Sequence, residues 1–330
     1  MRALVCTKIG GEEFLEVQDD WPAPKCGLDQ VRIAVHAASV NFPDVLIIRD
    51  LYQLKKEPPF VPGAEVSGVV TEVGADVSAF SVGDRVLSLT GLYGFAEEVV
   101  VGPPLQPFRM PDAMPWDEGA ALNLTYGTAA HGFQRGQLRK GETVLVLGAA
   151  GGCGSAGIEV AKAMGATVIA VAGGAEKVEL CRRLGADQTI DHQAVESLSG
   201  AVKALTDGRG VDVLFDTVGG ATVREHLRCM AWNGRYLVIG FAAGEVPSIG
   251  LNQTILKSIS VVGVAYGASA IADPADNRAL LEQLFTWYEA GKLKPAIGGR
   301  FSLDDGADAI RMLSERRALG KVVIEIQPSS

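Results

Sequence analysis

The chain has 330 residues, of which 48% are hydrophobic and 21% charged, a balance typical of a folded globular protein and not of a disordered one. Its formal net charge of −9 argues against nucleic-acid binding as the main function, although a helix N-terminus or a local basic patch can still hold a small anion. The length favours two domains.

The cysteines and the apolar stretches narrow the class of protein further. Five cysteines without any Cys-x-x-Cys spacing predict neither a disulfide framework nor a cysteine zinc site. The longest charge-free stretches contain several glycines and are shorter than the ~18 residues that a membrane span needs. The N-terminal segment has no apolar run of signal-peptide length. We therefore expect a soluble, cytoplasmic protein of a reducing compartment.

The first 120 residues consist of short apolar runs separated by turn residues. Eleven of the 15 prolines lie in the first 115 residues, which suits strands and turns better than long helices. Strands are expected over 31–40, 64–74, 84–91 and 95–102. This part is predicted to be mostly β-structure, folded up as a barrel.

From about residue 120, apolar strand-like runs alternate with helical runs. Strands are expected over 142–150, 167–173, 187–190, 211–219, 234–241 and 258–266, and helices over 155–166, 175–186, 194–206, 221–231 and 251–257. Such alternation implies parallel strands with crossover helices. Six such strands are the doubly wound dinucleotide-binding plan.

The C-terminal tail is predicted to contain two helices, over 277–290 and 304–316, and a final strand over 321–326. A strand after the sixth strand of a doubly wound sheet has no natural place in that sheet, so it is expected to return to the N-terminal domain. The predicted domains are 1–122, 123–266, and a tail over 267–330 that belongs with the first.

A glycine-rich segment carries the strongest local signal. It reads Gly148-Ala-Ala-Gly151-Gly152-Cys153-Gly154, follows an apolar strand and begins a helix. Gly151 and Gly152 allow a tight turn and close approach of the backbone to a pyrophosphate, Gly154 lets the helix pack on the strand, and the helix N-terminus offers N–H groups. The spacing differs from G-x-G-x-x-G, so a packing turn is the alternative, but the surrounding strand–helix units favour a dinucleotide site.

The end of the second strand of this sheet indicates which dinucleotide binds. In NAD sites an acid at this place holds the ribose 2′-hydroxyl, whereas this strand ends Val-Ala-Gly173-Gly174 with Lys177 just beyond. A lysine attracts a 2′-phosphate, which favours NADPH over NADH. Glu176 and Glu179 flank Lys177 and weaken the argument, and a solvated helix face is the alternative interpretation of this lysine.

The four histidines show no usual ligand spacing with a cysteine or an acid, so no metal site is predicted. His36 is expected to be a strand residue, either hydrogen-bonded or exposed. His226 lies in a predicted helix and is expected to be solvated.

Five segments, taken together and in order, resemble the zinc-independent quinone oxidoreductases (zeta-crystallin-like) of the medium-chain dehydrogenase/reductase superfamily. The resemblance covers nearly the whole chain, including the closing Gly320-Lys-Val-Val, and is specific as a set. The segments are Ala38-Ser-Val-Asn41-Phe-Pro-Asp44, Pro59-Phe-Val-Pro-Gly63-Ala-Glu65-Val-Ser-Gly68, Val82-Gly-Asp-Arg-Val86, Tyr126-Gly-Thr128-Ala129 and the glycine-rich segment 148–154.

This resemblance also accounts for the missing metal. Zinc-dependent relatives place a cysteine where this chain has Asn41 and Gly-His-Glu where it has Gly63-Ala64-Glu65, and they carry a four-cysteine lobe that is absent here. Without a Lewis acid to stabilise an alkoxide, the acceptor must already be activated. A quinone or another α,β-unsaturated carbonyl meets that requirement.

The resemblance implies an α/β fold with a GroES-like β-barrel domain and a Rossmann domain with a doubly wound, parallel, six-stranded sheet. It also implies ligands in the interdomain cleft and assembly as a homodimer or homotetramer. Carried over by position, the catalytic residues are Asn41, Asp44, Tyr52 and Thr128. The NADPH-binding residues are Gly151, Gly152, Cys153 and Gly154 at the phosphates, Gly173, Lys177 and His192 at the 2′-phosphate, Gly240, Phe241 and Tyr266 along the nicotinamide half, and Lys321.

The expected reaction is hydride transfer from C4 of NADPH to an electrophilic carbon, with Asn41 or Tyr52 donating a hydrogen bond to the carbonyl oxygen. The proton donor, the number of electrons per step and the natural acceptor stay open. One alternative is an enoyl- or acryloyl-type reductase, in which Arg49, Lys55 and Lys56 would meet a CoA thioester. Another is a non-catalytic NADPH-binding structural or RNA-binding protein, although the acidic balance counts against RNA.

Overall fold

The computed structural model describes residues 1–327, which form two compact units. Unit 1 comprises Met1–Leu124, Ala270–Leu281 and the chain from Pro295 onward, and unit 2 comprises Thr125–Ser269 and Glu282–Lys294. The segment 282–294 groups with unit 2, whereas the sequence assigned the whole tail to the first domain. One reason is local, because the Lys294 N–H donates to the Glu159 carboxylate at 3.3 Å. Within the described residues no helix is both long enough and apolar enough to cross a membrane.

Unit 1 is built on a seven-stranded sheet in the order β14-β15-β3-β4-β5-β7, with β6 also paired to β3, and on the small β1-β2 pair. The last strand, β15, pairs antiparallel with β3 and parallel with β14, so it lies beside the N-terminal strand as the sequence predicted. The strands are β1 (Ala3–Cys6), β2 (Leu15–Gln18), β3 (Val31–Val40), β4 (Glu65–Val73), β5 (Arg85–Leu89), β6 (Glu98–Val101), β7 (Phe108–Arg109), β14 (Ile297–Ser302) and β15 (Lys321–Glu325).

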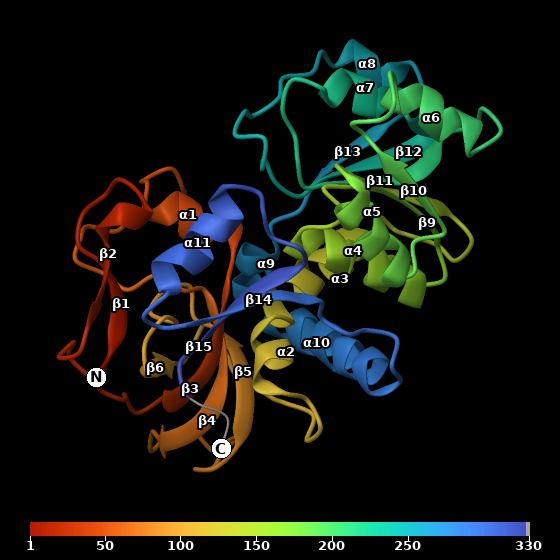
Figure 1. Ribbon diagram of the computed structural model, residues 1–330. Helices are drawn as coiled ribbons and strands as arrows, with labels where there is room; N and C mark the ends of the chain where they lie inside the picture. Colours follow the sequence, from red (N-terminus) through yellow and green to blue (C-terminus); the bar gives the residue numbers. More distant parts are fainter. Residues whose placement is uncertain (328–330) are drawn as a thin grey trace. The chain divides into compact units, whose positions relative to one another are not determined.

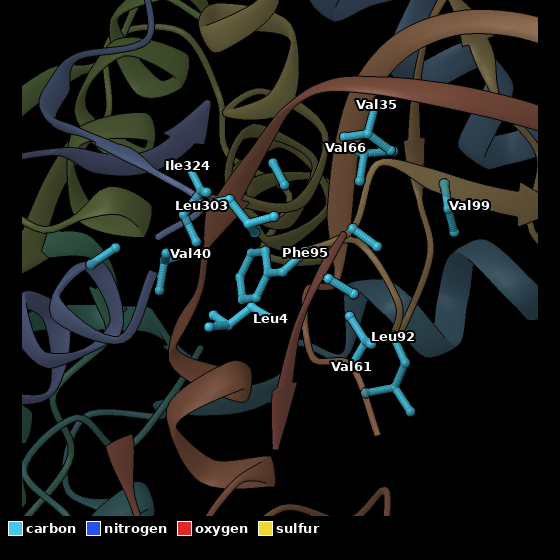
Figure 2. Close-up of a cluster of buried hydrophobic side chains, with 14 of the residues drawn as sticks. Leu4, Val35, Val40, Val61, Val66, Leu92, Phe95, Val99, Leu303 and Ile324 are labelled. Carbon is cyan, nitrogen blue, oxygen red and sulfur yellow. The ribbon is translucent and has the colours of Figure 1, made fainter. Parts of the chain in front are cut away.

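The core of unit 1 gathers apolar side chains that are far apart in the sequence. Figure 2 shows Phe95 beside Leu4, with Val40, Leu303 and Ile324 close by. Burial of side chains of this size stabilises a fold by about 1.5–3 kcal/mol each, which ties the C-terminal segments to the N-terminal strands. The helical segments of this unit are η1 (Glu12–Phe14), α1 (Phe42–Ile47), α2 (Trp116–Ala120) and α11 (Gly306–Ser314).

Unit 2 contains a parallel six-stranded sheet in the order β10-β9-β8-β11-β12-β13, and the predicted doubly wound fold is confirmed (Figure 1). Its strands read as nearly continuous apolar runs because crossover helices cover both faces of such a sheet. The strand order reverses between β8 and β11, and ligands bind at the carboxyl ends of strands at such a point.

The strands of unit 2 are β8 (Thr143–Leu147), β9 (Thr167–Ala172), β10 (Gln188–Asp191), β11 (Val211–Asp216), β12 (Met230–Val238) and β13 (Ser260–Gly263). The helices that connect or flank them are α3 (Asn123–Arg135), α4 (Gly152–Ala163), α5 (Ala175–Arg183), α6 (Leu198–Ala204), α7 (Val223–Arg228) and α8 (Asn252–Ile255). Helix α9 (Tyr266–Ala272) begins in unit 2 and ends in unit 1, and α10 (Pro274–Glu289) runs from unit 1 into unit 2.

Candidate functional site

The glycine-rich loop lies between β8 and α4 at the point where the strand order reverses. A Cβ added at Gly154 would lie 2.2 Å from the Gly148 carbonyl oxygen, so only glycine lets the first turn of the helix pack on this loop. At Gly151 the nearest atom to an added Cβ is the same oxygen, at 3.4 Å, so space remains above this residue. Open space at a helix N-terminus suits the pyrophosphate of a dinucleotide.

Residues that follow β11 and β12 lie at the same edge of the sheet. The Thr217 hydroxyl donates to the Leu147 carbonyl of β8 at 2.8 Å, which joins the two strands where their order reverses. Phe241 lies against Gly219, where an added Cβ would come within 2.7 Å of its ring, and the Gly240 N–H donates to the Asp216 carbonyl at 3.2 Å. The structure therefore brings Gly240 and Phe241 to the end of the strand that neighbours the glycine-rich loop.

The residues predicted at the 2′-phosphate lie at the ends of β9 and β10. The His192 N–H donates to the Ala172 carbonyl at 3.0 Å, and a Cβ at Gly173 would lie 2.6 Å from His192 Nε2. Gly173 and His192 are thus neighbours, although 19 positions separate them in the sequence. Lys177 is half-buried in the first half of α5, and Cys153 is half-buried in the first turn of α4.

Asp191 is a residue that the sequence analysis missed. Its carboxylate accepts hydrogen bonds from the Gly174 N–H at 3.0 Å and the Gln193 N–H at 2.9 Å, and these bonds hold its pKa below the usual range. The position at which an acid was expected is the end of β9, whereas this one ends β10, the neighbouring strand. Its position directly before His192 was the available signal.

Tyr266 and Thr128 lie near each other through helix α3. Tyr266 is 3% exposed, and a Cβ at Gly127 would come within 2.6 Å of its hydroxyl oxygen. Its ring also lies 6.2 Å from that of His131. Thr128, next to Gly127, is half-buried, so this residue and Tyr266 share one region of unit 2.

Unit 1 contains a buried polar cluster around Glu65. The Glu65 carboxylate accepts from Lys321 Nζ at 2.9 Å, from Asn41 Nδ2 at 3.0 Å, from the Ser39 hydroxyl, and from the Leu124 N–H at 2.8 Å. Lys321 Nζ also donates to Asn41 Oδ1 at 2.6 Å. The side chains of Glu65 and Lys321 are only 1% and 2% exposed, so each charge depends on the other.

This cluster fixes the amide of Asn41 and holds the ammonium of Lys321 inside unit 1. Asn41 Nδ2 donates to Glu65, to the Ser39 hydroxyl and to the Ser39 carbonyl, so its hydrogens are committed inside the unit. The ammonium of Lys321, which the resemblance assigned to the cofactor, is buried between Glu65 and Asn41. The missed residue Glu65 had a sequence signal, since a carboxylate inside an apolar strand needs a buried partner.

Asp44 is wholly buried beside this cluster. Its carboxylate accepts from the Asn41 N–H at 2.7 Å and the Gly63 N–H at 3.1 Å, at the start of α1. Burial raises the pKa of Asp44 to about 7, and these hydrogen bonds only partly oppose that effect. The pKa of Tyr52, a half-buried residue of the same unit, is raised by burial and by the charge of Asp44.

The prediction that His226 is solvated is wrong. His226 is 5% exposed, its Nδ1 lies 3.2 Å from Asp216 Oδ2, and its Nε2 lies 3.1 Å from the Thr222 hydroxyl. Its helix, α7, turns this side chain toward the end of β11, where a buried carboxylate needs hydrogen-bond donors. His36 stacks on Trp116 with ring centroids 4.4 Å apart, and its Nδ1 has no hydrogen-bond partner in the described part of the chain.

Comparisons with known proteins agree with this architecture. Residues 27–112 match the family model of the alcohol dehydrogenase GroES-like domain, and residues 152–286 match that of the zinc-binding dehydrogenases. Among the residues 1–327, no group of three or more His, Cys, Asp or Glu side chains is arranged to hold a metal ion. The fold and the two matches define the class as a medium-chain dehydrogenase/reductase.

Individual relatives narrow the assignment. The chain is 40% identical to the quinone oxidoreductase-like protein 2 homolog of Nematostella vectensis, over 98% of this chain and 88% of that protein. It matches a quinone oxidoreductase structure from Pseudomonas syringae with a TM-score of 0.91 and 31% identity, covering 98% and 99% of the two chains. An Escherichia coli quinone oxidoreductase complexed with NADPH matches with a TM-score of 0.90 and 26% identity, covering 99% and 100%. The chain belongs to the quinone oxidoreductase family of this superfamily.

Proposed function

We propose that this protein is an NADPH-dependent, zinc-independent reductase that transfers reducing equivalents to a quinone or another α,β-unsaturated carbonyl. The observation that carries the proposal is the open glycine-rich loop at the reversal of strand order, where a Cβ at Gly154 has no room and one at Gly151 does. When bound there, NADPH supplies a hydride from C4 of its nicotinamide. The NADPH-bound quinone oxidoreductase of Escherichia coli supports the choice of cofactor.

Two observations support NADPH over NADH. The imidazole of His192 lies directly beside Gly173, and Lys177 lies on the helix that begins just after this strand end. A basic side chain in this region favours a ligand with a 2′-phosphate. Asp191 Oδ1 accepts from the N–H groups of both Gly174 and Gln193, which ties this carboxylate to the backbone at the ends of β9 and β10.

The buried cluster of unit 1 supports activation of the acceptor without zinc. Lys321 provides a fixed positive charge beside Asn41, the position at which zinc-dependent relatives have a cysteine. Because the Asn41 amide hydrogens are committed to Glu65 and Ser39, we assign the hydrogen bond to the acceptor carbonyl to Tyr52. The raised pKa of Tyr52 keeps its hydroxyl protonated, as a donor requires.

The enoyl- or acryloyl-CoA alternative finds less support. Arg49 pairs with both carboxylate oxygens of Glu12, at 2.9 and 2.8 Å, and Lys55 pairs with Asp50 at 2.9 Å. Of the three basic residues predicted to meet a CoA phosphate, two are therefore engaged in ion pairs of the protein. A small activated carbonyl without a large anionic group is the favoured acceptor.

We also propose that the chain self-associates, as a dimer or tetramer, through the edge of the unit 2 sheet. Strand β13 ends the sheet order, so one of its edges has no neighbour within the described chain. Large apolar side chains near it are exposed, among them Leu251 at 81%, Ile255 at 76% and Leu256 at 74%. A cytoplasmic location belongs to the same proposal and is supported by the five cysteines, which form no disulfide within the described residues.

The experiment that tests the function is a panel of acceptors run with NADPH and NADH in parallel. It includes a quinone, a simple enone and an acryloyl thioester, and purified protein is assayed with and without a zinc chelator. The proposal expects rapid NADPH oxidation with the quinone or the enone, unchanged by the chelator. Preference for the thioester would favour the alternative reductase, and NADPH binding with no turnover of any acceptor would favour a non-catalytic role.

A further inference from the structure

A buried carboxylate at the end of β11 gathers four hydrogen-bonding groups around one side chain. Asp216 Oδ1 accepts from the N–H groups of Val218 and Gly219 at 2.7 and 2.9 Å. Its Oδ2 accepts from the Tyr236 hydroxyl and lies 3.2 Å from His226 Nδ1. The side chains of Asp216, His226 and Tyr236 are 1%, 5% and 3% exposed. A Thr222 hydroxyl bonded to His226 completes the group.

The electrostatics show that the carboxylate is built to be ionised. Burial alone would disfavour the charged form, yet hydrogen bonds from His226, Tyr236 and Gly219 hold the pKa of Asp216 below its usual range. A buried charge with this many donors fixes the groups around it, because moving any donor away leaves the charge uncompensated.

The backbone held by Asp216 is the backbone that borders the proposed cofactor crevice. Its carboxylate anchors the turn at 218–219, and its carbonyl accepts from the N–H groups of Ile239 and Gly240 at 3.0 and 3.2 Å. Thr217, between the strand and the turn, bonds the Leu147 carbonyl of β8 at 2.8 Å. A Cβ at Gly148 would lie 2.4 Å from the Thr217 hydroxyl oxygen, so the anchored turn directly touches the glycine-rich loop.

We propose that Asp216 is a positioning residue for the dinucleotide: its buried carboxylate fixes the turn at 218–219 beside the glycine-rich loop and so shapes the crevice where β8 and β11 diverge. This inference rests on the proposed function, because it takes that crevice to hold NADPH. The ends of β9 and β10, where Gly173 and His192 lie, have no contact from Asp216 among the hydrogen bonds of the described chain. The influence of Asp216 is therefore confined to the nicotinamide half of the cofactor, beyond the adenosine 5′-phosphate.

Binding of NADPH and of adenosine 2′,5′-bisphosphate, each titrated by calorimetry against the full-length protein, tests this confinement. The second probe carries the adenosine end but lacks the nicotinamide. Asp216→Ala removes the anchor, and we expect it to weaken NADPH binding at least tenfold while the bisphosphate stays within threefold of wild type. Asp216→Asn keeps one oxygen for Val218 and Gly219, and we expect it to restore NADPH affinity to within threefold.

A matched pair of threonine variants keeps the test decisive if Asp216→Ala does not fold. Thr217→Val removes the bond to Leu147, and Thr206→Val removes a comparable bond to the Val202 carbonyl at 2.8 Å, at the opposite end of β11. Thr217→Val is expected to weaken NADPH binding severalfold and Thr206→Val to leave both ligands unchanged.

The possible results distinguish failure of the positioning role from failure of the proposed function. Unchanged NADPH affinity in Thr217→Val, or equal weakening of both ligands in Thr217→Val or Asp216→Ala, would overturn the positioning role while leaving NADPH binding by the wild type intact. Failure of Asp216→Asn to restore affinity would overturn it as well. Wild-type protein that binds neither ligand would instead overturn the proposed function, and this inference with it.

Discussion

Lys321 Nζ lies 2.9 Å from Glu65 Oε1, and both side chains are almost completely buried. The pair joins the last strand of the chain to β4, although 256 positions separate the two residues. Removing two charges from water is costly, so such a pair is stable only when further hydrogen bonds satisfy it, and Asn41 and Ser39 supply them here. The pairing of these two opposite charges is therefore required for the stability of unit 1.

Replacing Lys321 with methionine should expose that requirement. Lys321→Met leaves the Glu65 carboxylate buried without its cation, and we expect a loss of about 3–5 kcal/mol in the free energy of unfolding, the usual cost of breaking a buried pair on one side. Urea denaturation followed by far-ultraviolet circular dichroism measures the change. The double variant Lys321→Met with Glu65→Gln should recover a large part of it.

The exposed pair of Arg182 and Glu179 on α5 provides the matched control. Their side chains are 56% and 57% exposed, and exposed pairs contribute about 0–1 kcal/mol. Arg182→Met should therefore change stability by less than 1 kcal/mol. Similar effects of Lys321→Met and Arg182→Met would contradict the structural role of the buried pair.

Asp44 predicts a pH dependence of stability. Its pKa is about 7 in the folded protein and about 3.8 ordinarily, so the folded state holds the proton more tightly than the unfolded chain. Ionisation of Asp44 therefore opposes folding. The stability that the protonated carboxyl contributes is lost as pH rises from about 4 through about 7. Asp44→Asn removes this titration, so between pH 5 and pH 8 wild type should lose about 2–3 kcal/mol more than the variant.

Urea midpoints at several pH values measure this difference, and Asp84→Asn serves as the control. Hydrogen bonds from the Ser81 N–H and Arg109 hold the pKa of Asp84 below its usual range, so this residue is ionised throughout that interval. The stability difference between Asp84→Asn and wild type should then stay constant from pH 5 to pH 8. A constant difference for Asp44→Asn as well would contradict the raised pKa.

Lys177 predicts the cofactor preference. If this side chain meets the 2′-phosphate, Lys177→Ala loses one charge-assisted contact, and we expect KM for NADPH to rise about tenfold while KM for NADH changes less than twofold. Steady-state kinetics with a fixed quinone measures both constants. Arg182→Ala, an exposed residue of the same helix, should change neither, and equal effects of Lys177→Ala on the two cofactors would remove Lys177 from the 2′-phosphate site.

The architecture of unit 2 was predictable because each strand is a nearly continuous apolar run between helical segments, and a buried parallel sheet requires that pattern. The pairings of buried polar groups were not predictable. The fold brings together Lys321 and Glu65, and likewise Asp216 and Tyr236. The periodicity of one segment does not indicate which distant residue its polar side chain will contact.

The burial of His226 had a usable signal in the sequence. His226 lies three residues after Val223 and one before Leu227, both buried, so helical periodicity places it on the face that packs inward. Only the strand end facing this helix, with the carboxylate of Asp216, explains why a histidine is buried there.

Two glycines of the loop separate its role in folding from its role in binding. A Cβ at Gly154 would collide with the Gly148 carbonyl at 2.2 Å, so Gly154→Ala should lower both the melting temperature and NADPH affinity. Gly151 has an ordinary φ of −81° and only one neighbour near an added Cβ, at 3.4 Å, so Gly151→Ala should fold with nearly unchanged stability. Its methyl group would nevertheless occupy the space assigned to the pyrophosphate, so NADPH affinity should fall at least tenfold. Differential scanning fluorimetry and calorimetric titration measure the two properties, and a Gly151→Ala protein that binds NADPH as tightly as wild type would mean that the pyrophosphate does not lie above this residue.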